Sequence, residues 1–131
     1  MDVMCGGIYM YDPPKQSESE QAAVLVSSGS EQSGMRPFVI VSRDLVNKNK
    51  NTAVGVPMST RIHKANSYRV LLPAGELIRE GWSTFQFQDS VALCDHVRVL
   101  DTTRIKEHIG RLSANALAAV GLGLAYVFDL R

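Results

Sequence analysis

The 131-residue sequence is poor in cysteine, with only Cys5 and Cys94. These two residues are far apart and form no CxxC motif, so neither a disulfide framework nor a cysteine-based metal site is expected. The histidines, His63, His96 and His108, lack the spacing of a zinc site, and the acidic residues form no clustered carboxylate motif. We therefore expect a protein that works without a metal ion or other cofactor.

Long apolar segments are also missing. The sequence has no run of about 18 apolar residues, the length that a membrane-spanning helix needs. The first five residues, Met1-Asp2-Val3-Met4-Cys5, lack the basic and apolar regions of a signal peptide. We expect a cytoplasmic protein, and the 45% hydrophobic content is enough for the core of one domain over residues 1–131.

The chain has little net charge, +1, but the charges are unevenly distributed. Residues 35–73 contain seven basic side chains and one acidic side chain, a balance of +6, whereas residues 1–34 carry −4 and residues 74–131 carry −1. Basic side chains gathered on one face favour contact with nucleic-acid phosphates. Solubilising charges scattered over several loops would give the same count, and the sequence leaves both interpretations open.

Short apolar segments separated by turn residues predict a protein made mainly of strands. The expected strands are Gly6–Tyr11, Phe38–Val41, Ala53–Pro57, Tyr68–Leu72, Phe85–Phe87, and two more over residues 89–95 and 96–101. Phe38–Val41 is continuously apolar and is therefore expected to be a buried central strand. Residues 13–30, rich in Ser, Glu and Gln, are predicted to form a long loop, either a lid over a site or an unremarkable insertion.

Helical signals are concentrated at the C-terminus. Ser113 is a predicted N-cap, and Leu117, Val120, Leu124 and Val127 or Phe128 recur at helical spacing. Shorter features are also predicted: one helical turn over 42–47 capped by Ser42, a short helix or turn over 102–108, and a break at 110–113. Many short strands followed by one helix indicate a β-rich α+β fold, a small β-barrel with a C-terminal helix.

The stretch from Gly29 to Ser42 places one arginine between a flexible segment and a buried strand. Gly34 permits unusual backbone conformations, while Pro37 favours an extended conformation at Arg36. Arg36 is therefore a candidate functional residue, although an arginine before a strand commonly has its stem on the sheet and its head in water. Ser59 and Thr60 end the next strand, where hydroxyls often only satisfy backbone groups.

The order of seven short motifs resembles the MazF/PemK (Kid) family of toxin endoribonucleases. The resemblance covers residues 6 to 124, nearly the whole chain. The motifs are Gly7-Ile8-Tyr9, Gly29-Ser30-Glu31-Gln32, Arg36-Pro37, Val39-Ile40-Val41-Ser42, Pro57-Met58-Ser59-Thr60, Asp95-His96-Val97-Arg98 and Ile109-Gly110-Arg111-Leu112-Ser113. The resemblance implies an SH3-like barrel, a homodimer, a MazE-like antitoxin as partner, and metal-independent cleavage of single-stranded RNA.

The resemblance also implies a set of site residues. By position, the catalytic residues are Arg36, Ser59, Glu31 and Asp95; the substrate-binding residues are Gln32, Thr60, Arg61, Lys64 and Arg98. Ser59 stands where the family has threonine, and Thr60 could take its role after a shift of one residue. Loop 13–30 is longer than is usual in the family, so access to the site or base preference could differ.

The chemistry of RNA cleavage fits these side chains. The 2′-OH of RNA is its own nucleophile, so cleavage requires a base, positive charge at the phosphorane, and a proton for the leaving 5′-oxygen. The planar guanidinium of Arg36 suits two phosphoryl oxygens, and a serine hydroxyl can add a hydrogen bond. Glu31 and Asp95 are the alternative bases, because arginine normally stays protonated. The expected products carry 2′,3′-cyclic phosphate and 5′-OH ends.

Other interpretations remain open from the sequence. A gyrase-binding toxin similar to CcdB, or an inactive SH3-like protein-binding module, would share the fold class without needing Arg36 and Ser59 together. His96 is interpreted as structural despite its position beside Asp95. Tyr9 and Trp82 could stack on bases, but such aromatic residues more often fill the core of a small barrel.

Overall fold

The computed structural model describes residues 2–14, 34–48, 51–81 and 83–130. The strands in these ranges are β1 Gly7–Tyr11, β2 Arg36–Ile40, β3 Thr52–Ser59, β4 Arg69–Leu72, β5 Leu77–Arg79, β6 Ser90–Leu93, β7 Arg98–Asp101 and β8 Ile105–Leu112. The helices are α2 Asp44–Asn47 and α3 Ala114–Phe128. Short 3-10 turns are η1 Ile62–Lys64, η2 Ala74–Glu76, η3 Cys94–His96 and η4 Thr102–Arg104.

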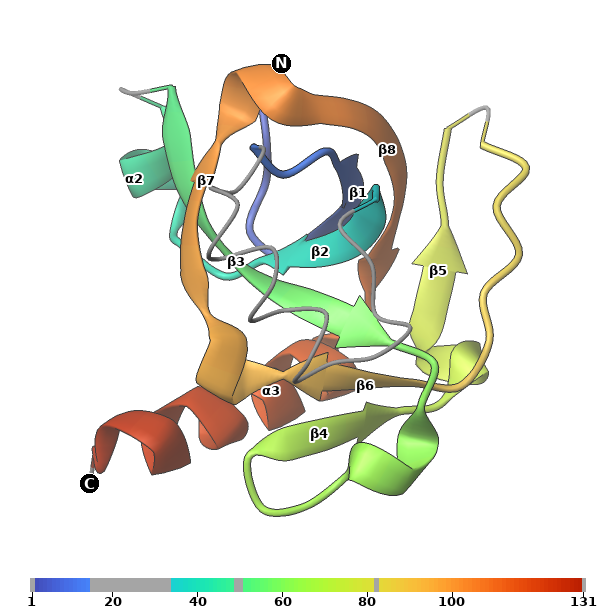
Figure 1. The fold of residues 1–131 in the computed structure, drawn as a ribbon, viewed down its shortest axis with the longest axis vertical. Helices are drawn as coiled ribbons and strands as arrows, with labels where there is room; N and C mark the ends of the chain where they lie inside the picture. The colour runs from blue at the N-terminus through green and yellow to red at the C-terminus, as the bar shows by residue number, and fades with distance from the viewer. Residues whose placement is uncertain (1, 15–33, 49–50, 82, 131) are drawn as a thin grey trace.

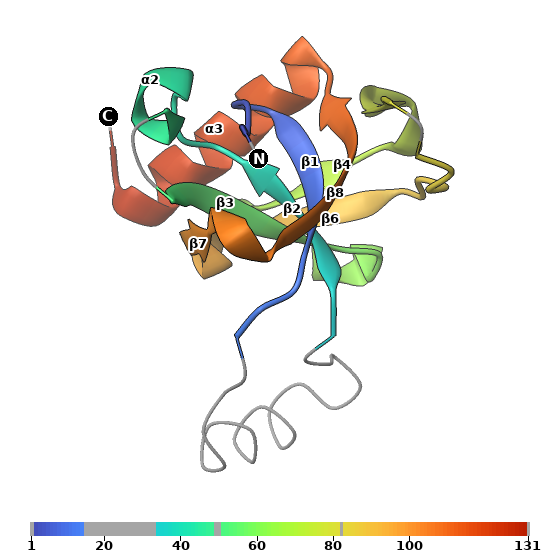
Figure 2. The ribbon, with the colours of Figure 1, turned by 90° about the horizontal axis from the view of Figure 1, so that it is seen from above.

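The strands form one curled antiparallel sheet. Its order is β4-β6-β3-β2-β1-β8-β5, and β7 pairs with the first half of β3 while β6 pairs with the last two residues of β3. Figures 1 and 2 show the sheet curving round on itself, with α3 lying along one side. This architecture is the predicted small SH3-like barrel with a C-terminal helix.

The central strands are buried on both faces. In β1, Ile8 belongs to a cluster that also contains Val120 of α3, whereas Tyr9 belongs to a second cluster with Phe38 and Leu100 on the concave side of the sheet. Successive side chains of a strand point to opposite faces, so β1 and β2 need apolar residues at consecutive positions. The prediction that Phe38–Val41 is a buried central strand is confirmed for Phe38, Val39 and Ile40, which have no exposed surface.

The C-terminal helix begins where the sequence predicts. The Ser113 hydroxyl accepts a hydrogen bond from the Ala116 amide, an N-cap that satisfies one free donor of the first turn. Val120 is fully buried, and Gly123 lies so close to β4 and η3 that an added Cβ would be 2.7 Å from Val70 Cγ2 and 2.8 Å from Cys94 Sγ. Gly123 therefore permits close packing of the helix. Of the two alternatives predicted for the end of the apolar stripe, Val127 packs against the core, whereas Phe128 is 56% exposed.

Several local predictions are wrong in whole or in part. Residues 85–87 lie outside the strands. The short helix or turn predicted over 102–108 is confirmed only for η4, and the strand β8 occupies residues 105–112, where the rest of that helix and a break were predicted. The Ser42 hydroxyl does not cap α2; it accepts a hydrogen bond from Val54 N of β3. For residues 105–112 and for Ser42, pairing with a neighbouring strand outweighs the local preference of the sequence. Strand β5 was not predicted, because its three residues are too few for a detectable period.

Both cysteines are free thiols. Cys94 is buried, and burial raises its pKa to about 11. No helix in the described part of the chain has the length and apolar character needed to span a membrane.

Candidate functional site

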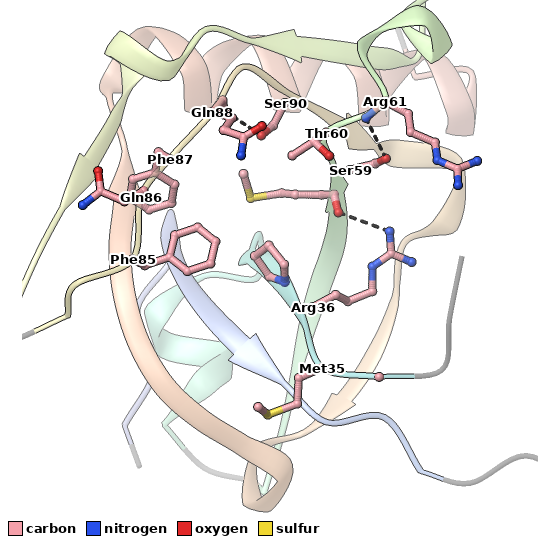
Figure 3. Close-up of a pocket in the computed structure, with 13 residues that line it drawn as sticks. Met35, Arg36, Ser59, Thr60, Arg61, Phe85, Gln86, Phe87, Gln88 and Ser90 are labelled. Carbon is pink, nitrogen blue, oxygen red and sulfur yellow. Dashed lines mark hydrogen bonds between the residues drawn. The ribbon is translucent and has the colours of Figure 1, made fainter. Parts of the chain in front are cut away.

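A cavity of about 430 Å³ opens where β2 begins and β3 ends. One wall is formed by Arg36 and Pro37 of β2 and by the end of β3, Ser59, with Thr60 and Arg61 following it. The opposite wall is the segment Phe85–Gln88 between β5 and β6 (Figure 3). The cavity is therefore bordered by positive charge and hydroxyl groups on one side and by aromatic rings on the other.

The register of the sheet brings Arg36 and Ser59 together. Phe38 pairs with Pro57 across β2 and β3, and the same antiparallel register carried two residues further sets Arg36 opposite Ser59. Arg36 is half-buried, and its Nη2 donates a hydrogen bond to the Met58 carbonyl at 3.2 Å. Figure 3 shows the guanidinium on the same side of the cavity as Ser59 and Arg61. Arg36 and Ser59, two predicted site residues that are far apart in the chain, thus share one wall.

The two hydroxyls at the end of β3 differ in their surroundings. Ser59 Oγ accepts a hydrogen bond from the Arg61 backbone amide at 3.1 Å, which leaves its hydroxyl proton available to donate, whereas Thr60 is exposed. Both residues line the cavity. The turn that follows the strand therefore fixes the position of the Ser59 oxygen.

Asp95 is placed differently from the prediction that it acts as a base. Both of its carboxylate oxygens accept hydrogen bonds from Arg69, at 3.0 Å from Nε and 2.8 Å from Nη2, and it is not among the residues lining the cavity. The hydrogen bonds from Arg69 lower the pKa of Asp95 below 3.8, which weakens it as a base. Burial is the main cause that lowers the pKa of the neighbouring His96, and Asp95 opposes that shift.

We expect Asp95→Asn to lower the free energy of unfolding near pH 7 by about 1 kcal/mol or less, because the Arg69 pair is partly exposed. The folded pKa of Asp95 is depressed, so the stabilisation is present above the ordinary carboxyl pKa and is lost as the pH falls through the folded value. Urea unfolding of both proteins at several pH values measures this difference. A deficit that stayed constant down to strongly acidic pH would contradict the ion pair as its cause.

The remaining predicted site residues are dispersed. Lys64 ends the turn η1 after the cavity wall, and Arg98 of β7 places its guanidinium carbon 5.1 Å from the centre of the Phe38 ring, away from the cavity lining. Glu31 and Gln32 lie outside the described residues. The structure therefore groups Arg36, Ser59, Thr60 and Arg61, and it leaves Arg98 and Asp95 at separate positions.

The sequence interpretation missed the aromatic wall of the cavity. Phe85 and Phe87 are half-buried, and their rings meet edge to face with centres 5.2 Å apart. The alternating residues Phe85–Phe87 were predicted to form a strand, and for that reason they were not considered as a wall of the cavity opposite Arg36. Of the two aromatic residues that were considered, Tyr9 is only 2% exposed and stacks on His108, and Trp82 lies outside the described residues.

Within the described ranges, no group of three or more His, Cys, Asp or Glu side chains is arranged to hold a metal ion. The chemistry available at the cavity is that of two guanidinium groups, three hydroxyls, two glutamine amides and aromatic faces. Guanidinium groups recognise phosphate through paired hydrogen bonds, and aromatic faces accept nucleobases. These are the features of a site for a phosphodiester chain with bases.

Comparison with protein families gives a match over nearly the whole chain. The model of a family described as "PemK-like, MazF-like toxin of type II toxin-antitoxin system" matches residues 5–128. A curated relative, Endoribonuclease MazF of Staphylococcus saprophyticus, is 35% identical over 92 residues, which is 70% of this chain and 72% of the relative.

Solved structures show the same fold at lower sequence identity. MazF from Deinococcus radiodurans superposes with a TM-score of 0.69 at 23% identity, covering 98% of each chain. A MazE–MazF structure from the same organism gives a TM-score of 0.70 at 23% identity and covers 100% of this chain and 99% of the other. An endoribonuclease from a mycobacterial species, solved in complex with its cognate antitoxin, gives 0.67 at 17% identity, covering 98% and 97%.

Proposed function

The chain belongs to the PemK-like, MazF-like toxin family of type II toxin–antitoxin systems, and we propose that it is a sequence-specific endoribonuclease that cleaves single-stranded RNA, including mRNA, and so inhibits translation and growth. The observation that carries this proposal is the position of Arg36 beside Ser59 on one wall of a cavity large enough for a nucleotide. A gyrase-binding toxin or an inactive module would not need this pair at a cavity.

In the proposed reaction the 2′-OH of the substrate attacks the adjacent phosphorus. The 2′-proton passes to a base, the bond to the 5′-oxygen breaks, and a proton is delivered to that oxygen, leaving 2′,3′-cyclic phosphate and 5′-OH ends. Arg36 is positioned to stabilise the negative charge of the phosphorane through two hydrogen bonds, and Ser59 can donate a third. No cofactor enters these steps, so we propose that cleavage is metal-independent.

Assignment of the base follows from the position of Asp95. Because Arg69 engages both Asp95 oxygens and lowers its pKa, Asp95 is a poor candidate to accept the 2′-proton. We favour Glu31, the other residue that the family resemblance implies as a base, which lies outside the described residues. Asp95 is better explained as an anchor for the Arg69 side chain.

Single substitutions can distinguish the roles of the Ser59 and Thr60 hydroxyls in cleavage. We expect Ser59→Ala to lower kcat for RNA cleavage by about 10²-fold, because it removes one hydrogen-bond donor at the developing charge. Thr60→Ala is expected to change kcat much less, since its side chain is exposed. Initial rates on a single-stranded RNA, with circular dichroism to verify folding, measure both effects. A larger decrease in kcat for Thr60→Ala than for Ser59→Ala would show that Thr60, and not Ser59, supplies the hydrogen bond to the phosphorane.

We also propose a MazE-like antitoxin as the partner. The relatives that support this include the D. radiodurans MazE–MazF structure and the mycobacterial endoribonuclease with its cognate antitoxin. Arg36 and Arg61 at the cavity would attract an acidic segment of such a partner, which would then exclude RNA. A toxin that acts on mRNA has to meet its substrate in the cytoplasm, and we propose that location for this chain.

We propose in addition that two copies form a homodimer through an apolar groove between β7 and α3. Apolar side chains line most of this groove, Val41, Val54, Val97, Val99, Leu124 and Phe128, together with Ser42 and Arg98. Val99 is 65% exposed and Phe128 is 56% exposed in the single chain. Contact with a second copy would remove these side chains from water, which favours association.

A further inference from the structure

The Phe85–Gln88 segment forms a second wall that the phosphate chemistry does not explain. Arg36, Ser59 and Arg61 on the facing wall supply what a phosphate group needs. Phe85 and Gln88 offer an aromatic face and an amide across the same cavity (Figure 3). The ring is not a partner of phosphate, and the amide can bind either a phosphate oxygen or the edge of a base. A nucleotide has a second part, the base, that such groups recognise.

The aromatic wall is rigidly supported. Phe87 packs over Gly110 of β8, where an added Cβ would lie 2.9 Å from the Phe87 ring and 2.4 Å from the Ile78 carbonyl oxygen. Phe85 meets Phe87 edge to face at 5.2 Å, and both rings contact the core beneath α3. Phe85 is therefore held in place from below, while Figure 3 shows its ring directed into the cavity, towards the side that carries Arg36. A fixed aromatic face loses little conformational entropy when it stacks on a ligand.

The two glutamines of the segment differ in direction. Gln88 points into the cavity, next to Phe87 and Ser90, whereas Gln86 points away from it (Figure 3). Gln86 Nε2 is 3.4 Å from the Thr84 backbone oxygen. The Ser90 hydroxyl donates a 2.8 Å hydrogen bond to the backbone carbonyl oxygen of Gln88, which fixes the backbone from which the Gln88 side chain extends. The Gln88 amide has both a donor and an acceptor, the combination that can distinguish the edges of bases.

We propose that Phe85 and Gln88 form a nucleobase subsite, in which Phe85 stacks on a base next to the scissile phosphate and the Gln88 amide contacts the edge of that base. The proposal rests on the proposed ribonuclease function and adds specificity-determining residues to it. Phe85 supplies affinity for any base, because every base has a π-face, and Gln88 supplies the preference for one base.

The stacking role is tested by two substitutions of similar size. Phe85→Leu keeps an apolar side chain against Phe87 but lacks the ring, whereas Phe85→Tyr keeps the ring. We expect Phe85→Leu to raise KM for a short single-stranded RNA about 10-fold with kcat little changed, and Phe85→Tyr to stay near wild type, since stacking is made equally in ground and transition states. Equal KM values for wild type and a folded Phe85→Leu protein would overturn the stacking role.

The role of Gln88 in base preference is tested by mapping cut sites in a random-sequence RNA pool. Gln88→Ala is expected to reduce the preference at one base position next to the cut by about 10-fold, while Gln86→Ala, the matched control, leaves the preference unchanged. Identical base preferences in wild type and Gln88→Ala would overturn this role. RNA left intact by the wild type is a different result, because it would refute the ribonuclease function itself and the subsite with it.

Discussion

Arg36→Ala is expected to abolish detectable RNA cleavage, with a decrease in kcat of about 10³-fold, and to remove toxicity on expression. The guanidinium is the principal positive charge positioned at the cavity beside Ser59, and loss of such a group at a developing phosphorane charge has effects of this order. Arg36→Lys keeps the charge but lacks the planar fork, so it should retain only part of the activity. Cleavage rates on a defined single-stranded RNA measure the series.

A matched substitution separates this effect from a general loss of basic charge. Arg43 is exposed and lies just beyond the other end of β2, so Arg43→Ala removes the same side chain at a distance from the cavity. It should cleave at nearly the wild-type rate. Cleavage by a folded Arg36→Ala protein at a rate similar to that of Arg43→Ala would remove Arg36 from the mechanism.

Phe38→Ala is expected to lower the free energy of unfolding by about 3–5 kcal/mol, because it removes a large side chain with no exposed surface from the middle of the barrel. The Phe38 ring meets Tyr11 edge to face at 5.2 Å, and the Arg98 guanidinium lies over it at 5.1 Å. The surrounding strands cannot collapse into the vacated space without breaking their pairing. Urea unfolding at equilibrium gives the free energy directly.

An exposed position supplies the comparison for Phe38. Leu122 of α3 is 74% exposed, and Leu122→Ala keeps a residue that favours helix, so its free energy of unfolding should change by less than about 0.5 kcal/mol. If Phe38→Ala cost as little as Leu122→Ala, the assignment of Phe38 to the centre of the barrel would be wrong. Because Phe38 follows Arg36-Pro37 directly, its burial also fixes the strand that carries Arg36, the proposed catalytic arginine.

The parts of the fold that were predictable are those where apolar pattern and local chemistry agree. Phe38–Val41 is apolar at every position because β2 is buried on both faces, and Ser113 precedes a helical apolar period as an N-cap. Arg36 and Ser59 were identified through motif order. Their proximity depends on the register of β2 with β3, which a single sequence does not reveal.

The parts that were missed depend on contacts between distant segments. The strand β8 contains Gly110, which suggests a break, yet the glycine is needed there because Phe87 and the Ile78 carbonyl occupy the space of a side chain. The pairing of Asp95, one of the two alternative bases, with Arg69 could not be foreseen because the two residues are 26 positions apart in the sequence. Phe85 was assigned to a strand for a related reason, since only the folded barrel shows that it faces Arg36.

The central claim is tested most directly by incubating the purified protein with a mixed single-stranded RNA in the presence of EDTA and mapping both new ends. The account predicts cuts at defined sequences, with 2′,3′-cyclic phosphate on one fragment and 5′-OH on the other, and no cuts by Arg36→Ala. RNA that stays intact with folded wild-type protein, both with EDTA and with added Mg²⁺, would contradict the account. Cleavage only with Mg²⁺, or ends with 5′-phosphate, would contradict the proposed chemistry.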